Sequence, residues 1–427
     1  MNSEKTPKRN SIWFGLCIML LINTIQPAHA ELLRIQVDAG AYDRQHTVVH
    51  FQLPMDLEQG IYILLRDDDT KTLLQVDHRN KGWFILDALA AGTTTRFELT
   101  ESSPVSEDVL KERTGGAGIS EFSGASAQGV NAQMDSDILT FSTEMGTVLS
   151  YYHGENDPPA VLDERYRRGG YIHPVYSPSG QVLTNHLNPD QHPHHAGIWS
   201  AWTNTIFEDR TPDFWNLHNN SGRVDVDSLL HSWNGPVMGG LISRHHFIDL
   251  SGNDPLVALN ELWEVRVYAA STQDDVHVFD LTVTQTTNTD RPLKLPEYRY
   301  GGIGFRGHSD WDDQEKCFFL TSDGLGRDGH ATRARWANMS GYANNHLAGF
   351  AILGHPSNFR FPQTMRIHPS EPFFNYAPTQ LGDMEITPGV PYVTKFRIVT
   401  HDGEPDSKLI DRLWRDFAYP PSVSIIE

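Results

Sequence analysis

The sequence has almost no cysteine, which excludes stabilisation by disulfides. Cys17 lies in an N-terminal apolar run, and Cys317 is the only other cysteine among the 427 residues. One cysteine in a mature chain cannot form an internal disulfide, so we expect the hydrophobic core to stabilise the protein. The chain is long enough to bury such a core.

Long apolar runs are also missing, which excludes a membrane-spanning segment in the mature chain. The run IWFGLCIMLLI, residues 12–22, is shorter than the roughly 20 residues that span a bilayer. Three basic residues precede this run, and the small-residue site Ala28-His29-Ala30 follows it. This order is typical of a secretory signal peptide. We therefore expect residues 1–30 to be removed and the mature protein to be periplasmic or secreted.

Positive charge is scarce: 34 lysines and arginines stand against 54 aspartates and glutamates, giving a formal charge of -20. Such a surface repels nucleic acids and anionic membranes, so neither is expected as a partner. The G-x-S-x-G, P-loop and H-E-x-x-H motifs of common serine hydrolases, NTPases and zinc proteases are absent. In contrast, 21 histidines, 10 tryptophans and 14 tyrosines can stack on sugars, titrate or bind metals, which favours a carbohydrate or other neutral polar ligand.

The pattern of apolar residues divides the chain into two β-rich regions. Short strand-like runs separated by turn residues fill 31–100 and predict a small β-sandwich domain. Residues 101–135 are rich in Ser, Gly and Ala and predict a linker. Strand-like runs continue over 136–427, several with period-two alternation, and predict a large antiparallel β-sandwich with long loops. The fold class is therefore expected to be all-β.

One segment near the C-terminus departs from the β pattern. In DSKLIDRLWRDFA, residues 406–418, the spacing of Leu409, Leu413 and Phe417 is helical. We expect a single helix here that packs across the sheet.

Four histidines lie within ten residues of the stretch NHLNPDQHPHHAGIWSAW, residues 185–202. His192 and His194 are two apart, so in extended backbone they point to the same side and can chelate one divalent metal ion, while His195 points to the other side. Asp190 could complete such a site or orient a ring. Alternatively, His194 or His195 transfers protons without a metal, because imidazole titrates near neutral pH. A third interpretation is that these histidines only hydrogen-bond the backbone of a proline-rich turn.

Trp199 and Trp202 follow the histidines on an expected strand. Because they are three residues apart, they are predicted to face opposite sides of the sheet. One is expected in the core, and the other could stack on a sugar ring, although either can equally be a core residue. The polar loop 210–222 carries Trp215 and His218 and is a further candidate for lining a site.

A second candidate motif is HPSNFRFP, residues 355–362, which directly follows the buried-looking strand LAGFAILG. His355 could transfer protons, and Asn358 and Arg360 could bind hydroxyl or carboxylate oxygens of a substrate. The alternative is a turn in which Asn358 caps backbone groups.

Gly302, Gly304 and Gly307 formally match a dinucleotide-binding fingerprint. No apolar strand precedes them, and the acidic SDWDD follows where a helix is required, so we expect these glycines to allow close approach of a strand to a neighbour or a ligand. Arg306 in the same segment could bind substrate or form a structural ion pair. The acidic residues 310–315 lack the spacing of an EF-hand and are expected to form a solvated loop.

Several of these motifs together give a family resemblance. YIHPVYSPSGQVLTNHLNPDQHPHHAGIWSAW, YRYGGIGFRG, TSDGLGRDGHATRARWANMSG and AILGHPSNFRFP resemble, in this order, the bacterial PmoA-like family of unknown function, often labelled methane oxygenase PmoA, over roughly 136–403. The resemblance implies a galactose-mutarotase-like sandwich and a sugar-related function. It implies pocket residues at His192, His194, His195, Arg306, His355, Asn358 and Arg360. Methane oxidation is not expected, because the methane monooxygenase subunit of that name is an integral membrane protein.

The leading hypothesis is an exported carbohydrate-active enzyme of the lyase, epimerase or hydrolase type. In one version His194 or His195 acts with His355 as acid and base, while Arg306 or Arg360 stabilises developing negative charge. In the other version the first two histidines of HPHH hold a divalent metal ion that polarises a substrate oxygen. The alternative from another class is a non-catalytic carbohydrate-binding module of the cell envelope that stacks sugars on the tryptophans.

Overall fold

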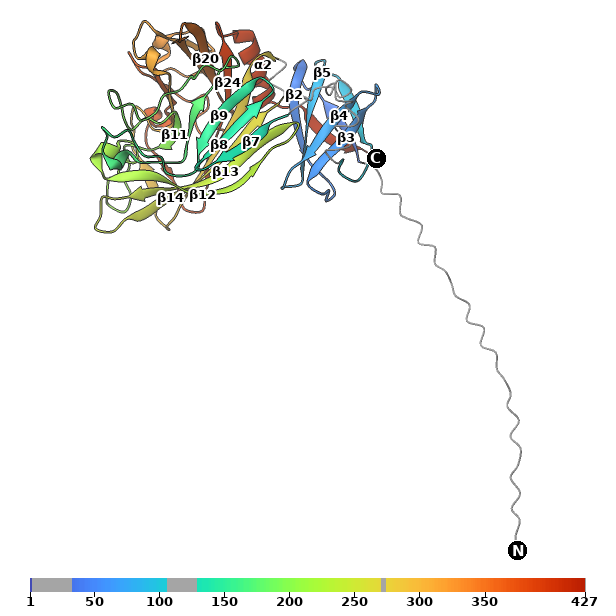
Figure 1. Cartoon of the computed structure of the whole chain (residues 1–427), viewed down its shortest axis with the longest axis horizontal. Helices are drawn as coiled ribbons and strands as arrows, with labels where there is room; N and C mark the ends of the chain where they lie inside the picture. Colours follow the sequence, from blue (N-terminus) through green and yellow to red (C-terminus); the bar gives the residue numbers. More distant parts are fainter. Residues whose placement is uncertain (2–32, 106–128, 270–273, 427) are drawn as a thin grey trace.

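The computed structural model describes residues 1, 33–105, 129–269 and 274–426. The predicted signal peptide, apart from Met1, and residues 106–128 of the predicted linker lie outside these ranges. Within them the regular secondary structure consists almost entirely of antiparallel strands (Figure 1), which confirms the predicted all-β class. A search of these ranges for a helix with the length and apolar character needed to cross a membrane finds none.

The N-terminal region forms a seven-stranded sheet in the order β2-β5-β4-β3-β6-β1-β25. Its strands are β1 (Arg34–Asp38), β2 (Arg44–Gln52), β3 (Gly60–Arg66), β4 (Lys71–Val76), β5 (Lys81–Leu89), β6 (Thr94–Leu99) and β25 (Ser422–Ile426). Strands β1 to β6 all contribute apolar side chains to one core cluster, as Ile35 and Val37 do from β1. The seventh strand, β25, comes from the far end of the chain and pairs antiparallel with β1.

The larger region is a sandwich of two eight-stranded antiparallel sheets, as predicted. The first sheet has the order β21-β22-β17-β11-β10-β9-β8-β7, with β7 (Asn131–Asp135), β8 (Ile138–Thr143), β9 (Gly146–Tyr152), β10 (Tyr171–Val175), β11 (Ile198–Ala201), β17 (Gly302–Arg306), β21 (Met365–Ile367) and β22 (Phe373–Tyr376). Its edge strand β7 is formed by residues that the sequence assigned to the linker, because they pair with β8 in register.

The second sheet of the sandwich has the order β12-β13-β14-β15-β24-β20-β19-β18. Its strands are β12 (Gly222–Trp233), β13 (Met238–Asp249), β14 (Leu256–Tyr268), β15 (His277–Thr287), β18 (Cys317–Thr321), β19 (Trp336–Ala343), β20 (His346–Gly354) and β24 (Tyr392–Asp402). A separate pair is formed by β16 (Leu293–Leu295) and β23 (Met384–Ile386). Short 3-10 turns are η1 (Glu164–Tyr166), η2 (Leu217–Asn219), η4 (Ser309–Trp311), η5 (Arg327–Gly329) and η6 (Pro378–Leu381).

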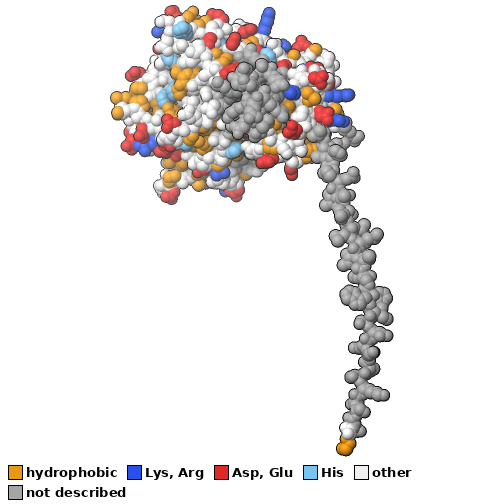
Figure 2. Space-filling view, turned by 45° about the vertical axis from the view of Figure 1, so that its right-hand side comes forward, with side chains coloured by type: hydrophobic (Ala, Val, Ile, Leu, Met, Phe, Trp, Pro, Cys, Tyr) orange, Lys and Arg blue, Asp and Glu red, His pale blue; other side chains and the backbone are white. Residues whose placement is uncertain are grey.

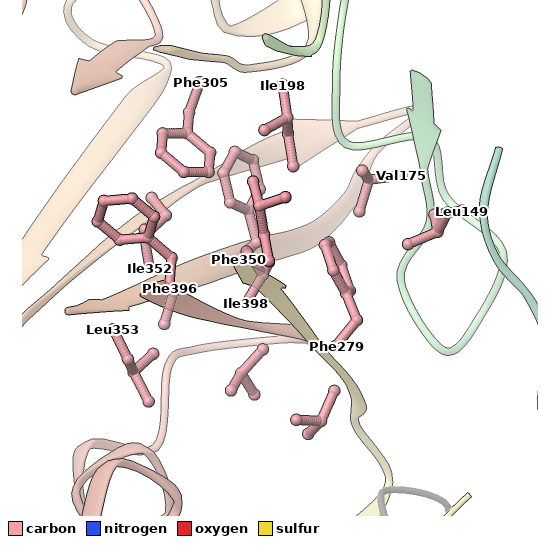
Figure 3. Close-up of a cluster of buried hydrophobic side chains, with 14 of the residues drawn as sticks. Leu149, Val175, Ile198, Phe279, Phe305, Phe350, Ile352, Leu353, Phe396 and Ile398 are labelled. Carbon is pink, nitrogen blue, oxygen red and sulfur yellow. The ribbon is translucent and has the colours of Figure 1, made fainter. Parts of the chain in front are cut away.

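The main hydrophobic core lies between the two large sheets (Figure 3). Leu149, Ile198 and Phe305 from the first sheet and Phe279 and Phe396 from the second are at most 2% exposed. Full burial of one such side chain stabilises the fold by roughly 1.5–3 kcal/mol. This core holds the two sheets together and so fixes the positions of the loops that connect their strands.

The predicted C-terminal helix is confirmed as α2 (Ser407–Ala418). It begins at Asp406, whose carboxylate accepts hydrogen bonds from two backbone N–H groups of the first turn. The indole of Trp414 donates to the backbone carbonyl at the end of β20, and Asp416 forms a buried ion pair with Arg44 of β2, 2.8 Å long. The helix therefore joins the sandwich to the N-terminal sheet.

The register of three neighbouring strands brings distant segments together at one end of the first sheet. Ile198 at the start of β11 pairs with Phe305, and Arg306 at the end of β17 pairs with Phe373 at the start of β22. Because these strands are antiparallel, the residues just before β11, at the end of β17 and just before β22 must lie side by side.

Candidate functional site

A group of metal-binding side chains lies at this end of the sheet. The ligand atoms of His192, His194 and His195 all lie within 4.8 Å of one another, and so do those of His192, His368 and Glu371. His192 belongs to both sets. We call these five residues the histidine cluster. The structure thus brings together the three histidines of the HPHH motif and adds two residues from the segment before β22. The expectation that His195 points away from the other two histidines is wrong, because the backbone here is a turn and not extended.

The loop before β11 folds back on itself to hold its histidines in place. The backbone N–H of His195 donates to the carbonyl of His192, and that of Leu187 donates to the carbonyl of His195. His192 has a φ of 47°, a left-handed conformation that is uncommon for residues other than glycine and often occurs at functional sites. At Gly197, where φ is 58°, any Cβ would collide with the carbonyl oxygen of Ile172. The close approach of β10 therefore requires glycine here.

His195 is enclosed by aromatic rings. Its ring stacks on His192 at 4.7 Å and on Phe373 at 5.0 Å, and Trp199 lies 4.8 Å away. Only 6% of His195 is exposed, and its Nδ1 has no hydrogen-bond partner within the described part of the chain. A buried nitrogen without a partner costs about 1–3 kcal/mol. This atom has a free coordination or hydrogen-bonding position.

Glu371 is held between a histidine and an arginine. His192 Nε2 lies 2.8 Å from Glu371 Oε2, and Arg306 Nη1 donates to the same carboxylate oxygen at 3.0 Å. Arg306 is 1% exposed, forms a second ion pair with Asp312 and donates to the side-chain oxygen of Gln191. Arg306 therefore acts inside the protein as a positioning residue for Glu371. The expectation of a solvated acidic loop is wrong for Asp312, because this ion pair draws it inward.

Burial sets the protonation states of the cluster. It lowers the pKa of His194 to about 3 and that of His368 to about 4, and it lowers the pKa of His195 well below its ordinary value. For Glu371 burial opposes ionisation, but the hydrogen bond from His192 and the charges of His192, His368 and Arg306 prevail and lower its pKa to about 2. At neutral pH the imidazoles of His194, His195 and His368 are therefore neutral and the carboxylate of Glu371 is ionised. These are ligand types that bind divalent transition metals.

The cluster reaches solvent through His192, whose side chain is 37% exposed. On the other side of His194, the exposed His218 from the loop after β11 lies at a ring distance of 6.0 Å. Arg168 donates to the backbone carbonyl of His194 and secures this part of the loop. A small polar molecule can therefore approach the cluster from the solvent at His192.

The tryptophans near the site are core residues. Trp199, Trp202 and Trp215 are 0%, 2% and 1% exposed. Trp199 and Trp215 pack against each other at 4.9 Å, and the indole of Trp202 donates to Gln285 in the core. None of these three rings is open to stack on a sugar, so the structure does not support them as substrate-binding residues. Trp215, in the loop 210–222, packs on the ring of Trp199 and helps to bury it.

The contacts of His355, Asn358 and Arg360 are with residues outside the histidine cluster. The ring of His355 bonds Ser357 and packs on the C-terminal helix, and Asn358 exchanges two hydrogen bonds with the backbone of Lys395 in β24. Arg360 donates to three backbone carbonyls, those of Pro378, Gly382 and Asp383. These contacts support the turn interpretation of the motif, and His355 is not placed as an acid–base partner of His194.

His368 and Glu371 were missed by sequence reasoning. Their segment, HPSE at 368–371, places a histidine and a carboxylate in a turn immediately before a strand, which is a usable but weak signal. The glycine prediction is confirmed: a Cβ on Gly304 would lie 2.8 Å from the rings of Trp199 and Trp215. This close approach positions Trp199 behind His195.

Comparison with known proteins gives a family but no activity. No curated protein matches the sequence. Among solved structures, the chain is similar to a protein from Klebsiella pneumoniae subsp. pneumoniae MGH 78578 assigned as an aldose 1-epimerase, at 10% identity over 87% of this chain and 95% of that chain. With a TM-score of 0.25, this likeness carries no conclusion about the activity of the chain. Residues 139–415 match the model of DUF6807, a family of unknown function, and the protein belongs to that family.

Proposed function

We propose that the protein is an exported enzyme that acts on a carbohydrate or a similar neutral polar substrate through the histidine cluster. One observation carries this proposal: neutral imidazoles from two distant segments converge with an ionised carboxylate beside the half-buried His192, which reaches solvent. Clusters of buried, perturbed titratable groups of this kind are typical of catalytic sites. The reaction class would be lyase, epimerase or hydrolase.

The charge of the protein supports a neutral substrate. Acidic side chains are spread over the face shown in Figure 2, and the formal charge of the chain is -20. Arg306, which holds Glu371, is already neutralised by two carboxylates. A polyanionic substrate would meet repulsion from this acidic surface.

The burial of the tryptophans favours an enzyme over a binding module. A sugar-binding module needs exposed aromatic faces, and the three tryptophans considered for this role are in the core. The histidine cluster, in contrast, offers proton acceptors and metal ligands.

Turnover in heavy water tests the proposal. The mature protein would be incubated with neutral oligosaccharides and modified sugars, and proton NMR would follow new products and hydrogen–deuterium exchange. We expect wild type and the control His78→Gln, an exposed residue of the N-terminal region, to give the same product. A His192→Gln, His194→Gln double variant should be slower by at least about 10²-fold. Equal turnover in the double variant, or binding without product across the panel, would refute the catalytic role.

A further inference from the structure

The cluster has the geometry of a metal site. We propose that His192, His194 and His195 bind one divalent transition-metal ion of the zinc type, and that Glu371 orients His192 through a hydrogen bond. This inference rests on the proposed function, because the ion would be the group that acts on the substrate.

The spacing of the donors carries the first part of the argument. Three imidazole ligand atoms lie within 4.8 Å of one another, so small rotations of the rings bring them around one ion. Three protein ligands are the usual number in catalytic zinc sites, where a fourth position remains open for water or substrate. When bound, the ion would polarise a substrate oxygen or acidify a bound water.

The unsatisfied nitrogen of His195 is an independent sign of a ligand. Only 6% of His195 is exposed, yet its Nδ1 lacks a hydrogen-bond partner in the described chain. Most buried polar atoms in proteins have a hydrogen-bond partner, so this nitrogen is open to a ligand. A metal ion held by its neighbours His192 and His194 would meet this requirement.

The hydrogen bond between His192 and Glu371 defines which nitrogen of His192 is free. The carboxylate of Glu371 accepts from Nε2 of His192, so Nδ1 is the nitrogen that this hydrogen bond leaves open to a metal ion. Metal-binding histidines typically donate their other N–H to a carboxylate, which fixes the tautomer and strengthens the ligand. Arg306 holds this carboxylate from its far side.

The second possible ligand set, His192, His368 and Glu371, is less suited to a cation. Both carboxylate oxygens of Glu371 face His192, at 3.1 Å and 2.8 Å, and one of them also accepts from Arg306. A metal bound directly by Glu371 would have to displace these hydrogen bonds and lie close to the guanidinium charge. This favours the three neighbouring histidines.

Metal titration of the mature protein tests the ligand set. After removal of metals with a chelator, Zn²⁺ stoichiometry would be measured by elemental analysis and affinity by calorimetry, and Co²⁺ absorption would report the coordination. Variants would be His192→Ala, His194→Ala and Glu371→Gln. The control is His78→Ala, because His78 and His231 lie at a ring distance of 4.5 Å and represent chance chelation by two neighbouring histidines.

We expect one ion per chain in wild type and in His78→Ala, and loss of stoichiometric binding in both histidine variants of the cluster. Glu371→Gln should still bind one ion, about 10- to 100-fold more weakly, with Co²⁺ bands close to those of wild type. The proposal is overturned if reconstituted wild type holds no ion, if the cluster variants bind as wild type does, or if Glu371→Gln abolishes binding. His192 is half-buried, so His192→Ala is the variant expected to fold normally, which thermal unfolding of the metal-free form would verify.

The outcomes also separate this inference from the proposed function. Undiminished turnover by the metal-free protein would show that the ion is not the group that acts on the substrate, and would leave the enzyme. A stoichiometric ion in a protein with no activity on any sugar would support the metal site and overturn the proposed substrate class.

Discussion

His192 and Glu371 are 179 residues apart in the chain, yet His192 Nε2 lies 2.8 Å from Glu371 Oε2. The contact exists because β11, β17 and β22 are neighbours in one sheet, so that the segments before β11 and before β22 meet. Arg306, at the end of the middle strand, binds the same carboxylate. The site is therefore assembled by sheet register.

Removing the positive charge of Arg306, which pairs with both Glu371 and Asp312, should destabilise the protein. In Arg306→Met the carboxylates of Glu371 and Asp312 lose their shared partner in a largely buried place, and we expect a loss of about 3–5 kcal/mol in the free energy of unfolding. Urea unfolding would measure it. The exposed Arg291→Met is the control and should stay within about 0.5 kcal/mol of wild type. A similar small change in Arg306→Met would contradict the role given to the network.

Acidification should destabilise the fold through a histidine outside the site. His277 in β15 is 0% exposed, and burial lowers its pKa to about 4, compared with roughly 6.5 when unfolded. The unfolded chain therefore binds more protons between these values, so stability is complete above pH 6.5 and falls as the pH drops towards 4. Between pH 7.5 and 5.0 this histidine should account for a loss of about 2 kcal/mol.

The variant His277→Leu tests this linkage. Whatever its stability at pH 7.5, the variant should lose less free energy of unfolding than wild type between pH 7.5 and 5.0. Urea unfolding at the two pH values would measure this loss. The exposed His346→Leu should keep the wild-type pH dependence. An unchanged pH dependence in His277→Leu would show that folding does not lower the pKa of His277.

A methyl group at Gly304 should disturb the histidine cluster through Trp199, which packs on His195. Its Cβ would lie 2.8 Å from the rings of Trp199 and Trp215, so Trp199 must shift and push on His195. We expect Gly304→Ala to lose about 1–3 kcal/mol and to change the near-ultraviolet circular dichroism. The control Gly354→Ala meets only ordinary contacts of 3.6 Å or more and should leave this spectrum unchanged. Identical spectra for wild type and Gly304→Ala would argue against tight packing there.

Asn358 should matter for stability and not for the site. Its side chain exchanges two hydrogen bonds with the backbone of Lys395 and is 4% exposed, so Asn358→Ala leaves a buried donor and acceptor unpaired. We expect a loss of about 1–3 kcal/mol. Metal content and turnover of the folded variant should equal those of wild type. If the folded Asn358→Ala variant binds metal normally but has lost turnover, Asn358 contributes to substrate binding after all.

Local patterns in the sequence were enough for the architecture and for part of the site. Alternating apolar residues predicted the all-β sandwich, and the spacing of Leu409, Leu413 and Phe417 predicted the helix. Clustering of His192, His194 and His195 is local too, because one short loop holds all three. Side-chain direction can be derived from neighbouring residues only where the backbone is a regular strand or helix. The direction predicted for His195 was wrong, because His192 has a left-handed backbone conformation and the loop turns there.

Only the tertiary structure decided which distant groups complete the site and which aromatic rings are buried. Glu371 joins His192 through the pairing of three strands, and β25 joins the N-terminal sheet from the other end of the chain. Trp199 and Trp202 lie in the core because rings from other segments, Trp215 and Tyr392, pack against them. Such outcomes depend on long-range register and on which layers pack together, and a local pattern contains neither.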